Sequence, residues 1–225
     1  MKLLAIDTTE EACSAALLLG AEVRERFEIA PRRHSELILP MMDDLLAEAG
    51  IDPNELDALA FGRGPGSFTG VRIATAIIQG AAVGSALPVL PVSSLQALAQ
   101  GVAREHGVKQ VLGGFDARMG EVYWGAYRRD AQGVMRPVHD ECVCEAASVP
   151  VPDGAAWRGA GSAWRTYREP LQALSGVADP VYDEAQVHAR DVATIAAAAW
   201  AEGQALPADQ ALPVYLRDRV AWTKT

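Results

Sequence analysis

Cysteine is scarce in this chain, and the cysteines that occur do not form a recognisable framework. The 225 residues contain only Cys13, Cys142 and Cys144. Disulfide frameworks are typical of short, cysteine-dense chains, and zinc-binding cysteines and histidines have a different spacing. On a strand, Cys142 and Cys144 would point to the same face, so we interpret them as small packing residues in a reduced protein.

Basic charge is also low. The chain has 20 Lys and Arg residues against 29 Asp and Glu residues, which gives a net charge of −9. Binding to phosphate groups depends on neutralisation by Lys and Arg, so we expect the chain not to bind nucleic acid by itself. The basic residues near the end, Arg217, Arg219 and Lys224, are interpreted as a solvated tail.

Long hydrophobic runs are absent. The apolar run at the N-terminus reaches Asp7 within a few residues and is too short for a signal peptide. The stretch 71–92 is the longest candidate for a membrane span, but Arg72 and Pro88 interrupt it. We therefore expect no membrane segment and a cytoplasmic location.

Glycine, by contrast, is concentrated in a loop between an expected strand at 56–61 and an expected helix at 69–84. Gly62, Gly64, Gly66 and Gly70 lie in this loop around Pro65. Glycine permits positive φ and close backbone approach, and proline fixes one residue of a turn. The loop has two interpretations, a binding site for an anion or a tight turn that packs a helix onto a sheet.

The start of the helix that follows has an unneutralised positive end. Ser67 and Thr69 can both cap it, and residues 62–84 contain neither Asp nor Glu. Such an end suits an anion. The known phosphate motifs nevertheless fail, since no lysine occurs between Lys2 and Lys109, and Gly70 falls one position late for a dinucleotide fingerprint.

The hydrophobic pattern predicts two α/β lobes, residues 1–106 and residues 107–225. Half of the residues are hydrophobic, which allows a sizeable core. The first lobe is expected to follow the order βββαβαβα, with strands at 2–7, 13–19, 22–29, 56–61 and 88–92 and helices at 31–49, 69–84 and 94–106. The second lobe repeats three strands followed by helices, with strands at 111–115, 121–127, 134–143, 156–160 and 180–182 and a helix at 191–202 that Asp191 caps.

Two polar turns are candidate sites. Asp7, Thr8 and Thr9 lie at the first hairpin, where a carboxylate and hydroxyls can face a phosphate or a metal, or can do no more than shape the turn. Together with Gly64, Gly66 and Ser67 they are candidates for a vestigial phosphate site. Asp116, Arg118 and Glu121 form a second turn, which is either a docking surface or an Asp–Arg pair that holds a hairpin closed.

Two helices carry more apolar surface than one sheet can cover. The stripe on 36–49 is wide, and 71–83 is apolar nearly all round. We predict an exposed patch that binds a partner protein. The alternative is that all of these residues lie inside the lobe. The predicted interface residues are Ile38, Met41, Met42, Leu45, Ile73, Ala74, Ile77, Ile78 and Ala81.

Several motifs along the whole chain resemble the bacterial TsaB (YeaZ) family. They are Ile6-Asp7-Thr8-Thr9, His34-Ser35-Glu36, the run from Gly62 to Ile73, Pro91-Val92-Ser93-Ser94-Leu95, the run from Asp116 to Tyr123, and Pro213-Val214-Tyr215-Leu216-Arg217. The resemblance implies the two-lobed fold of actin, Hsp70 and the sugar kinases (the ASKHA fold), with the two apolar helices side by side on the first lobe.

The resemblance also implies a function. In the family, TsaB acts with its catalytic paralogue TsaD and the ATPase TsaE to form N6-threonylcarbamoyladenosine at position 37 of tRNAs that read codons starting with A. TsaD carries the active site, and the complex uses ATP. The resemblance thus implies a heterodimer with TsaD, a homodimer when the chain is alone, contact with tRNA only through the complex, and no metal or cofactor bound by this chain.

The positions of the paralogue's ligands support a non-catalytic role. Through the resemblance, its two metal-binding histidines fall here on Ser94 and Leu98, and a leucine cannot ligate a metal. Its second phosphate loop, Gly-Gly-His-Thr, falls on 113–116, where Phe115 and Asp116 follow the two glycines. A scaffold subunit is the favoured hypothesis; the alternatives are a nucleotide-binding regulator and a degenerate ASKHA-type ATPase or metalloprotease.

Overall fold

Two five-stranded sheets form the two lobes of the protein. The structure is a computed structural model, and it describes residues 1–154 and 156–217. The first sheet has the strand order β3-β2-β1-β4-β5, and the second has the order β10-β6-β7-β8 with β9 also paired to β7. The strands of the first sheet are β1 (Lys2–Asp7), β2 (Ala12–Leu19), β3 (Glu22–Ile29), β4 (Ala58–Gly62) and β5 (Val89–Val92). Those of the second are β6 (Gln110–Arg118), β7 (Glu121–Arg129), β8 (Met135–Pro137), β9 (Cys142–Glu145) and β10 (Arg158–Ala160).

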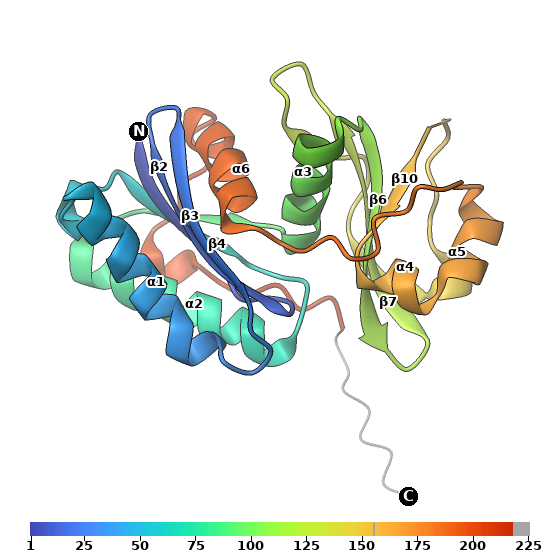
Figure 1. The fold of residues 1–225 in the computed structure, drawn as a ribbon, viewed down its shortest axis with the longest axis horizontal. Helices are drawn as coiled ribbons and strands as arrows, with labels where there is room; N and C mark the ends of the chain where they lie inside the picture. Colours follow the sequence, from blue (N-terminus) through green and yellow to red (C-terminus); the bar gives the residue numbers. More distant parts are fainter. Residues whose placement is uncertain (155, 218–225) are drawn as a thin grey trace, which may run out of the picture.

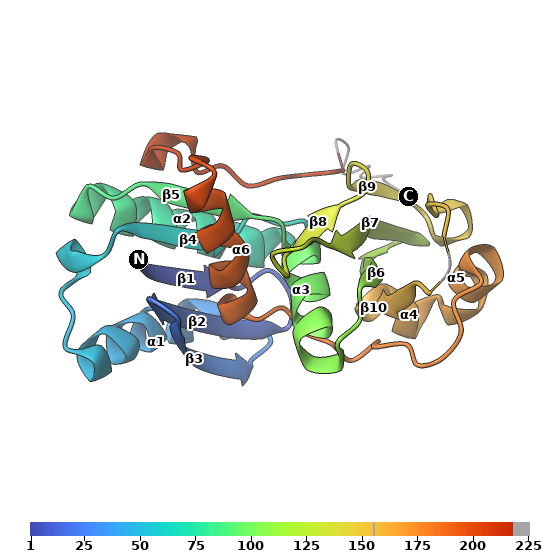
Figure 2. The same cartoon turned by 90° about the horizontal axis from the view of Figure 1, so that it is seen from above.

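Helices cover both faces of the first sheet (Figures 1 and 2). The helices α1 (His34–Ala49) and α2 (Phe68–Ser85) lie side by side on one face, and α6 (Ala189–Ala201) packs on the other. β1 lies at the centre, parallel to β4 and antiparallel to β2. Its residues are buried from Leu3 onward, as expected of an apolar run covered on both faces.

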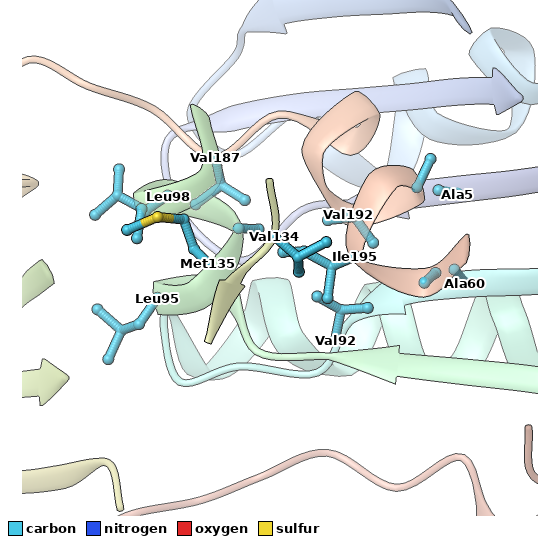
Figure 3. Close-up of a cluster of buried hydrophobic side chains, with 14 of the residues drawn as sticks. Ala5, Ala60, Val92, Leu95, Leu98, Val134, Met135, Val187, Val192 and Ile195 are labelled. Atoms are coloured by element: carbon cyan, nitrogen blue, oxygen red, sulfur yellow. The ribbon is translucent and has the colours of Figure 1, made fainter. Parts of the chain in front are cut away.

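The helices α3 (Ser94–His106) and α6 lie between the two sheets and join the lobes (Figure 2). α3 packs against β6, β7 and β8 of the second sheet as well as against α6. Figure 3 shows the resulting cluster, in which side chains of both helices meet residues from both sheets. One continuous hydrophobic core therefore runs through both lobes.

A second set of helices covers the outer part of the second sheet. These helices are α4 (Ser162–Thr166) and α5 (Arg168–Ser175), and they belong to a core with three buried tryptophans. The rings of Trp124 and Trp164 lie 5.7 Å apart, and the indole nitrogen of Trp164 donates a hydrogen bond of 2.9 Å to the carbonyl of Leu112. The buried indole is thus satisfied, which fixes α4 against β6.

The structure confirms the α/β class, the two lobes and the order βββαβαβα in the first lobe. The second lobe differs from the predicted order. The strand expected at 134–143 is two separate strands, β8 and β9, and residues 162–175 form the two helices α4 and α5. The strand expected at 180–182 is a single bridge between Ala160 and Tyr182.

The second half of the chain also returns to the first lobe. The boundary expected between residues 106 and 107 separates the two sheets, but α6 packs on β1, β2, β4 and β5. Leu206 then bridges to Val89 beside the edge strand β5, and the backbone nitrogen of Val214 donates a hydrogen bond of 2.8 Å to the carbonyl of Arg63. The two lobes are therefore interleaved in sequence.

One predicted helix cap is wrong. Asp191 does not cap α6, because the helix begins at Ala189 and its N-cap residue is His188. Both carboxylate oxygens of Asp191 instead accept hydrogen bonds from the guanidinium of Arg104 on α3, at 3.0 and 2.8 Å. Asp191 is 1% exposed and the Arg104 side chain is 31% exposed, so this bidentate pair, buried at its carboxylate, ties the two helices together between the sheets.

Candidate functional site

The glycine loop packs directly on the turn between β1 and β2. β4 ends at Gly62 and α2 begins at Phe68. Because β1 and β4 are parallel neighbours, the loops that follow them leave the sheet side by side, at the carboxyl ends of the two strands. A Cβ atom on Gly62 would lie 1.8 Å from Oδ2 of Asp7, and one on Gly70 would lie 2.0 Å from the carbonyl oxygen of Thr8. Any side chain at these positions would collide with the turn, so glycine is required by packing.

Hydrogen bonds close the same contact from both sides. The backbone nitrogen of Ser67 donates to the carbonyl of Thr9 at 2.7 Å, and Oγ1 of Thr8 donates to the carbonyl of Gly70 at 2.7 Å. On the far side of the loop, the backbone nitrogen of Gly64 donates to Oγ of Ser94 at 3.2 Å. The inner face of the loop is thus filled by the chain itself.

Two residues were predicted to cap α2, and the structure confirms one of them. Ser67 is the N-cap residue, and its Oγ accepts a hydrogen bond of 3.5 Å from the backbone nitrogen of Gly70. Thr69 lies inside the helix. The first turn contains no acidic residue, and the cap and the carbonyl of Thr9 both face its positive end.

Asp7 is committed to its own turn. It is fully buried, and its carboxylate accepts hydrogen bonds from the backbone nitrogen of Thr9 at 2.8 Å and from Oγ1 of Thr9 at 2.9 Å. Burial raises the pKa of Asp7 to about 6, and the bonds from Thr9 offset part of that rise. This geometry matches turn chemistry rather than an open phosphate or metal site.

A cleft of about 1200 Å³ opens between the lobes on the outer side of these loops. Its walls come from the β1–β2 turn, the glycine loop with Gly66 and Ser67, the start of α1, the β6–β7 turn and α4. The charges that line it are mixed. They are Arg32, Arg72, Arg118, Arg165 and Arg217 together with Glu10, Glu11, Asp116 and Asp183.

Two polar groups in the cleft have unusual surroundings. Burial, helped by the nearby charges of Asp7 and Glu11, raises the pKa of Glu10 to about 8, so this carboxyl is mostly protonated at neutral pH. Nε2 of His34, the first residue of α1, is buried and has no hydrogen-bond partner among the described residues. Neither group was among the predicted site residues, because a single Glu or His gives no signal in the sequence.

The second polar turn contains the Asp–Arg pair that was one of its two interpretations. The backbone nitrogen and Nη1 of Arg118 donate to the carboxylate of Asp116, at 2.8 and 3.1 Å, and the hydroxyl of Tyr167 donates to it at 3.2 Å. Glu121 pairs with Arg217 from the C-terminal segment. The Arg118 side chain is nevertheless 84% exposed, so a docking role for this turn stays a prediction.

The predicted interface residues divide into two groups. Five of them lie in the core of the first lobe, namely Ile38, Met42, Leu45, Ala74 and Ile78. Their side chains pack between the helices and the sheet, so they cannot form an exposed patch. The other four are partly exposed at the margin of that core, namely Met41, Ile73, Ile77 and Ala81.

Further exposed apolar residues, which were not among the predicted interface residues, extend the surface that these four residues form. Val83 is 72% exposed near the end of α2, and Leu39 is 51% exposed on α1. Ala76 and Gly80 are also exposed on α2, where Arg72 is the one charged residue of the helix. The outward face of α2 is therefore built from small and apolar side chains.

Metal ligands are not grouped in the described part of the chain. Among residues 1–154 and 156–217, no three His, Cys, Asp or Glu side chains lie where they could hold one metal ion. Ser94 and Leu98 are fully buried, and Leu98 belongs to the core between the lobes.

None of the helices that the structure describes combines the length and apolarity needed to cross a bilayer. Arg219 and Lys224 lie outside the described residues.

Comparison with known proteins matches the whole chain to one family. The chain is 42% identical over 227 aligned positions to the tRNA threonylcarbamoyladenosine biosynthesis protein TsaB of Escherichia coli (strain K12), which covers all of this chain and 98% of that protein. The chain belongs to the TsaB family. The TsaB of Haemophilus influenzae is 39% identical over 234 aligned positions, with 100% of this chain and 97% of that protein covered.

Structural comparison agrees with this assignment to the TsaB family. A structure of YeaZ from Pseudomonas aeruginosa superposes with a TM-score of 0.89 at 47% sequence identity, and the match covers 96% of this chain and 99% of that one. The family model described as TsaD, tRNA N6-adenosine threonylcarbamoyltransferase, matches residues 27–160. The resemblance seen in the sequence motifs is therefore confirmed, and this chain is related to TsaD through a stretch that includes the glycine loop.

Proposed function

We propose that this chain is a non-catalytic scaffold subunit for the formation of N6-threonylcarbamoyladenosine at position 37 of tRNAs that read codons starting with A. It binds and supports the catalytic paralogue TsaD, and TsaE joins them as the ATPase. The names of the TsaB relatives support the pathway. The role within the pathway is inferred from the candidate site.

The observation that carries the proposal is the closed contact between the glycine loop and the β1–β2 turn. In a nucleotide-binding relative these loops would present backbone N–H groups to a phosphate. Here the backbone nitrogen of Ser67 donates to Thr9, and the carboxylate of Asp7 accepts from Thr9. Because these groups are occupied by the chain itself, they have little capacity left for a ligand.

The surface that we assign to TsaD is the outward face of α2 with the adjoining edge of α1. Ile73, Ile77 and Ala81 are partly exposed there, and Val83 extends the strip toward the end of α2. A Cβ atom on Gly80 would meet no described atom within 4 Å, so a partner helix can approach closely. Two helices that meet two related helices of TsaD would form a four-helix bundle. Without TsaD the same face would form a two-fold homodimer.

Contact with tRNA is proposed to occur only through the complex, which also uses ATP. A chain of net charge −9 should by itself bind tRNA no more tightly than the non-specific range of roughly 10⁻⁴ to 10⁻⁶ M at physiological salt. Sub-micromolar binding of tRNA by this chain alone would contradict this part of the proposal.

Co-purification tests the partnership directly. Untagged TsaD from the same organism should co-elute with the tagged chain, and the complex should gain affinity for tRNA. The isolated chain should not hydrolyse ATP, and a metal should not change this. ATP turnover by the purified chain that Asp7→Asn abolishes would overturn the scaffold assignment in favour of a degenerate ASKHA-type ATPase.

A nucleotide-binding regulator is the second candidate, because the cleft between the lobes offers polar groups without partners. Nε2 of His34 has no hydrogen-bond partner among the described residues, the pKa of Glu10 is raised to about 8, and arginines line the same space. Isothermal titration of the isolated chain with ATP and ADP separates the candidates. The scaffold proposal predicts no saturable heat, whereas a regulator would bind one nucleotide per chain with loss of binding in His34→Ala.

A further inference from the structure

The thiols of Cys142 and Cys144 are in contact on one face of β9. Their Sγ atoms lie 3.8 Å apart, and both residues are free and partly exposed. The two positions are separated by one residue on the strand, so both side chains point the same way. The third cysteine, Cys13, is fully buried in the first lobe.

β9 is positioned so that it can adjust when these sulfurs move. It pairs with β7 on one side, where Cys142 is opposite Trp124 and Cys144 is opposite Val122. No other described strand pairs with β9, so its other side is a sheet edge. An edge strand is held by one ladder of hydrogen bonds and can pucker without breaking a second one.

We propose that Cys142 and Cys144 are a reversible dithiol–disulfide pair that reacts with low-molecular-weight disulfides such as glutathione disulfide. The thiolate of Cys142 attacks one sulfur of the oxidant, which forms a mixed disulfide and releases one glutathione. Cys144 then loses its proton to solvent and attacks Sγ of Cys142, which forms the Cys142–Cys144 bond and releases the second glutathione. Two protein thiols are oxidised, and one glutathione disulfide is reduced to two thiols.

The electrostatics assign the first step to Cys142. With Cys144 as the donor of the hydrogen bond between the two sulfurs, that bond lowers the pKa of Cys142, although burial and the nearby Glu141 oppose this change. The same hydrogen bond and burial raise the pKa of Cys144. Thiol–disulfide exchange proceeds through the thiolate, so Cys142 is the attacking group at neutral pH and Cys144 is the resolving group.

The strand geometry makes the bond reversible. On an extended strand, the Cα atoms of residues i and i+2 are separated by roughly 6.8 Å. This distance is at the upper end of the Cα–Cα range that disulfides span. The sulfurs must also approach by about 2 Å to reach bonding distance. The pair can therefore close, but the product is easily reduced, as expected of a labile rather than a structural disulfide.

The pair lies beside a contact between β9 and the start of α3. Glu141, the residue before Cys142, accepts hydrogen bonds from the hydroxyl groups of Ser93 and Tyr127. Ser93 is the N-cap residue of α3, the helix that joins the lobes. A change in the pucker of β9 would thus occur next to the joint between the two sheets.

Cys13 provides an internal control. Burial raises the pKa of its thiol to about 12, so Cys13 should stay unreactive in the folded chain. At pH 7 we expect Cys142 to be alkylated at least tenfold faster than Cys13. Full reaction of Cys13 should require denaturation.

The test uses the full reduced chain in buffers of increasing glutathione disulfide, followed by acid quenching, alkylation and peptide mass spectrometry. We expect loss of two hydrogens from the peptide that carries Cys142 and Cys144, no retained glutathione, and full reversal by reduced glutathione. Cys144→Ser should trap glutathione on Cys142, whereas Cys142→Ser should react much more slowly. Cys13→Ser should behave like the wild type.

Two results would overturn the proposal. One is a wild-type chain that retains glutathione on both cysteines, which would show that the thiols react independently. The other is a chain that stays fully reduced even in excess oxidant, which would make the cysteines packing residues only. Circular dichroism of both serine variants ensures that they are compared in the folded state.

Discussion

A Cβ atom on Gly62 would lie 1.8 Å from Oδ2 of Asp7. The two residues end neighbouring parallel strands, where Ile6 is opposite Phe61, so the loop after β4 meets the carboxylate after β1. This contact and the hydrogen bonds of Thr9 around it fill the inner side of the glycine loop. The glycine loop therefore serves packing in this chain.

Substitution of Gly62 tests this packing role. Gly62→Ala should lower the free energy of unfolding by about 3 kcal/mol, because the added methyl group must displace the buried carboxylate of Asp7. Gly80→Ala is the matched control, since that glycine is on α2 with no described atom within 4 Å of the added carbon. The control should be neutral or more stable by about 0.5–1 kcal/mol. Urea unfolding of both variants makes the comparison, and equal stabilities would contradict the packing role.

The raised pKa of Asp7 predicts a defined pH dependence. Burial raises its pKa from the ordinary value of 3.8 to about 6, so the folded state holds this proton more tightly than the unfolded state. The corresponding stability is present below about pH 4 and is lost as the pH rises through 6, on the order of 3 kcal/mol in total. Asp7→Asn cannot titrate, and its carbonyl oxygen can still accept from Thr9.

The difference between the two unfolding curves isolates this group. Relative to Asp7→Asn, the wild type should lose stability between about pH 4 and pH 6 and stay level above pH 7. A difference that grows in the opposite direction would mean that the folded state favours the charged carboxylate. That outcome would point to an open site around Asp7 with a cationic or hydrogen-bonding partner.

Two adjacent isoleucines on α2 distinguish the interface from the core. Ile77 is partly exposed, whereas Ile78 is fully buried against the sheet. Ile77→Asp should remain folded, with a nearly unchanged thermal midpoint, but should lose both self-association and binding to TsaD. Ile78→Asp should unfold, because it buries an unpaired charge. Light scattering and thermal melting measure both effects, and an Ile77→Asp variant that still binds TsaD would exclude this face.

The ion pair between α3 and α6 should be important for joining the lobes. Arg104→Ala leaves the buried Asp191 without its partner, and the expected loss is about 1–3 kcal/mol because the Arg104 end of the pair is 31% exposed. Arg118→Ala removes an exposed arginine that also pairs with an aspartate, and the expected loss is at most about 1 kcal/mol. Urea unfolding measures the loss of stability in both variants. Comparable losses would show that burial of the Asp191 carboxylate has no special role.

The first lobe could be predicted because its signals are local. Glycines, a serine cap and apolar runs set the borders of β4 and α2 to within about two residues. The second lobe was harder, because α4 and α5 are short, with five and eight residues. Their positions depend on the burial of Trp164 against β6, which is a contact between distant segments.

The candidate site could be predicted only in part. The sequence indicated that Asp7 and the glycine loop belong together, but not that the loop and the β1–β2 turn fill each other. On α2, Ile77 and Ile78 are neighbouring residues of the same type. Only the position of the sheet decides which of the two side chains is exposed. Asp191 was assigned as a cap because its partner Arg104 is far away in sequence.

The most direct test of the account is the yield of N6-threonylcarbamoyladenosine in tRNA, measured by nucleoside mass spectrometry after reaction with ATP, TsaE and the threonylcarbamoyl-adenylate donor. We expect no product with this chain and no TsaD, product when the cognate TsaD is added, and retention of that product with folded Asp7→Asn but not with Ile77→Asp. Product formed without TsaD, or lost with an Asp7→Asn variant that still binds TsaD, would contradict the non-catalytic role.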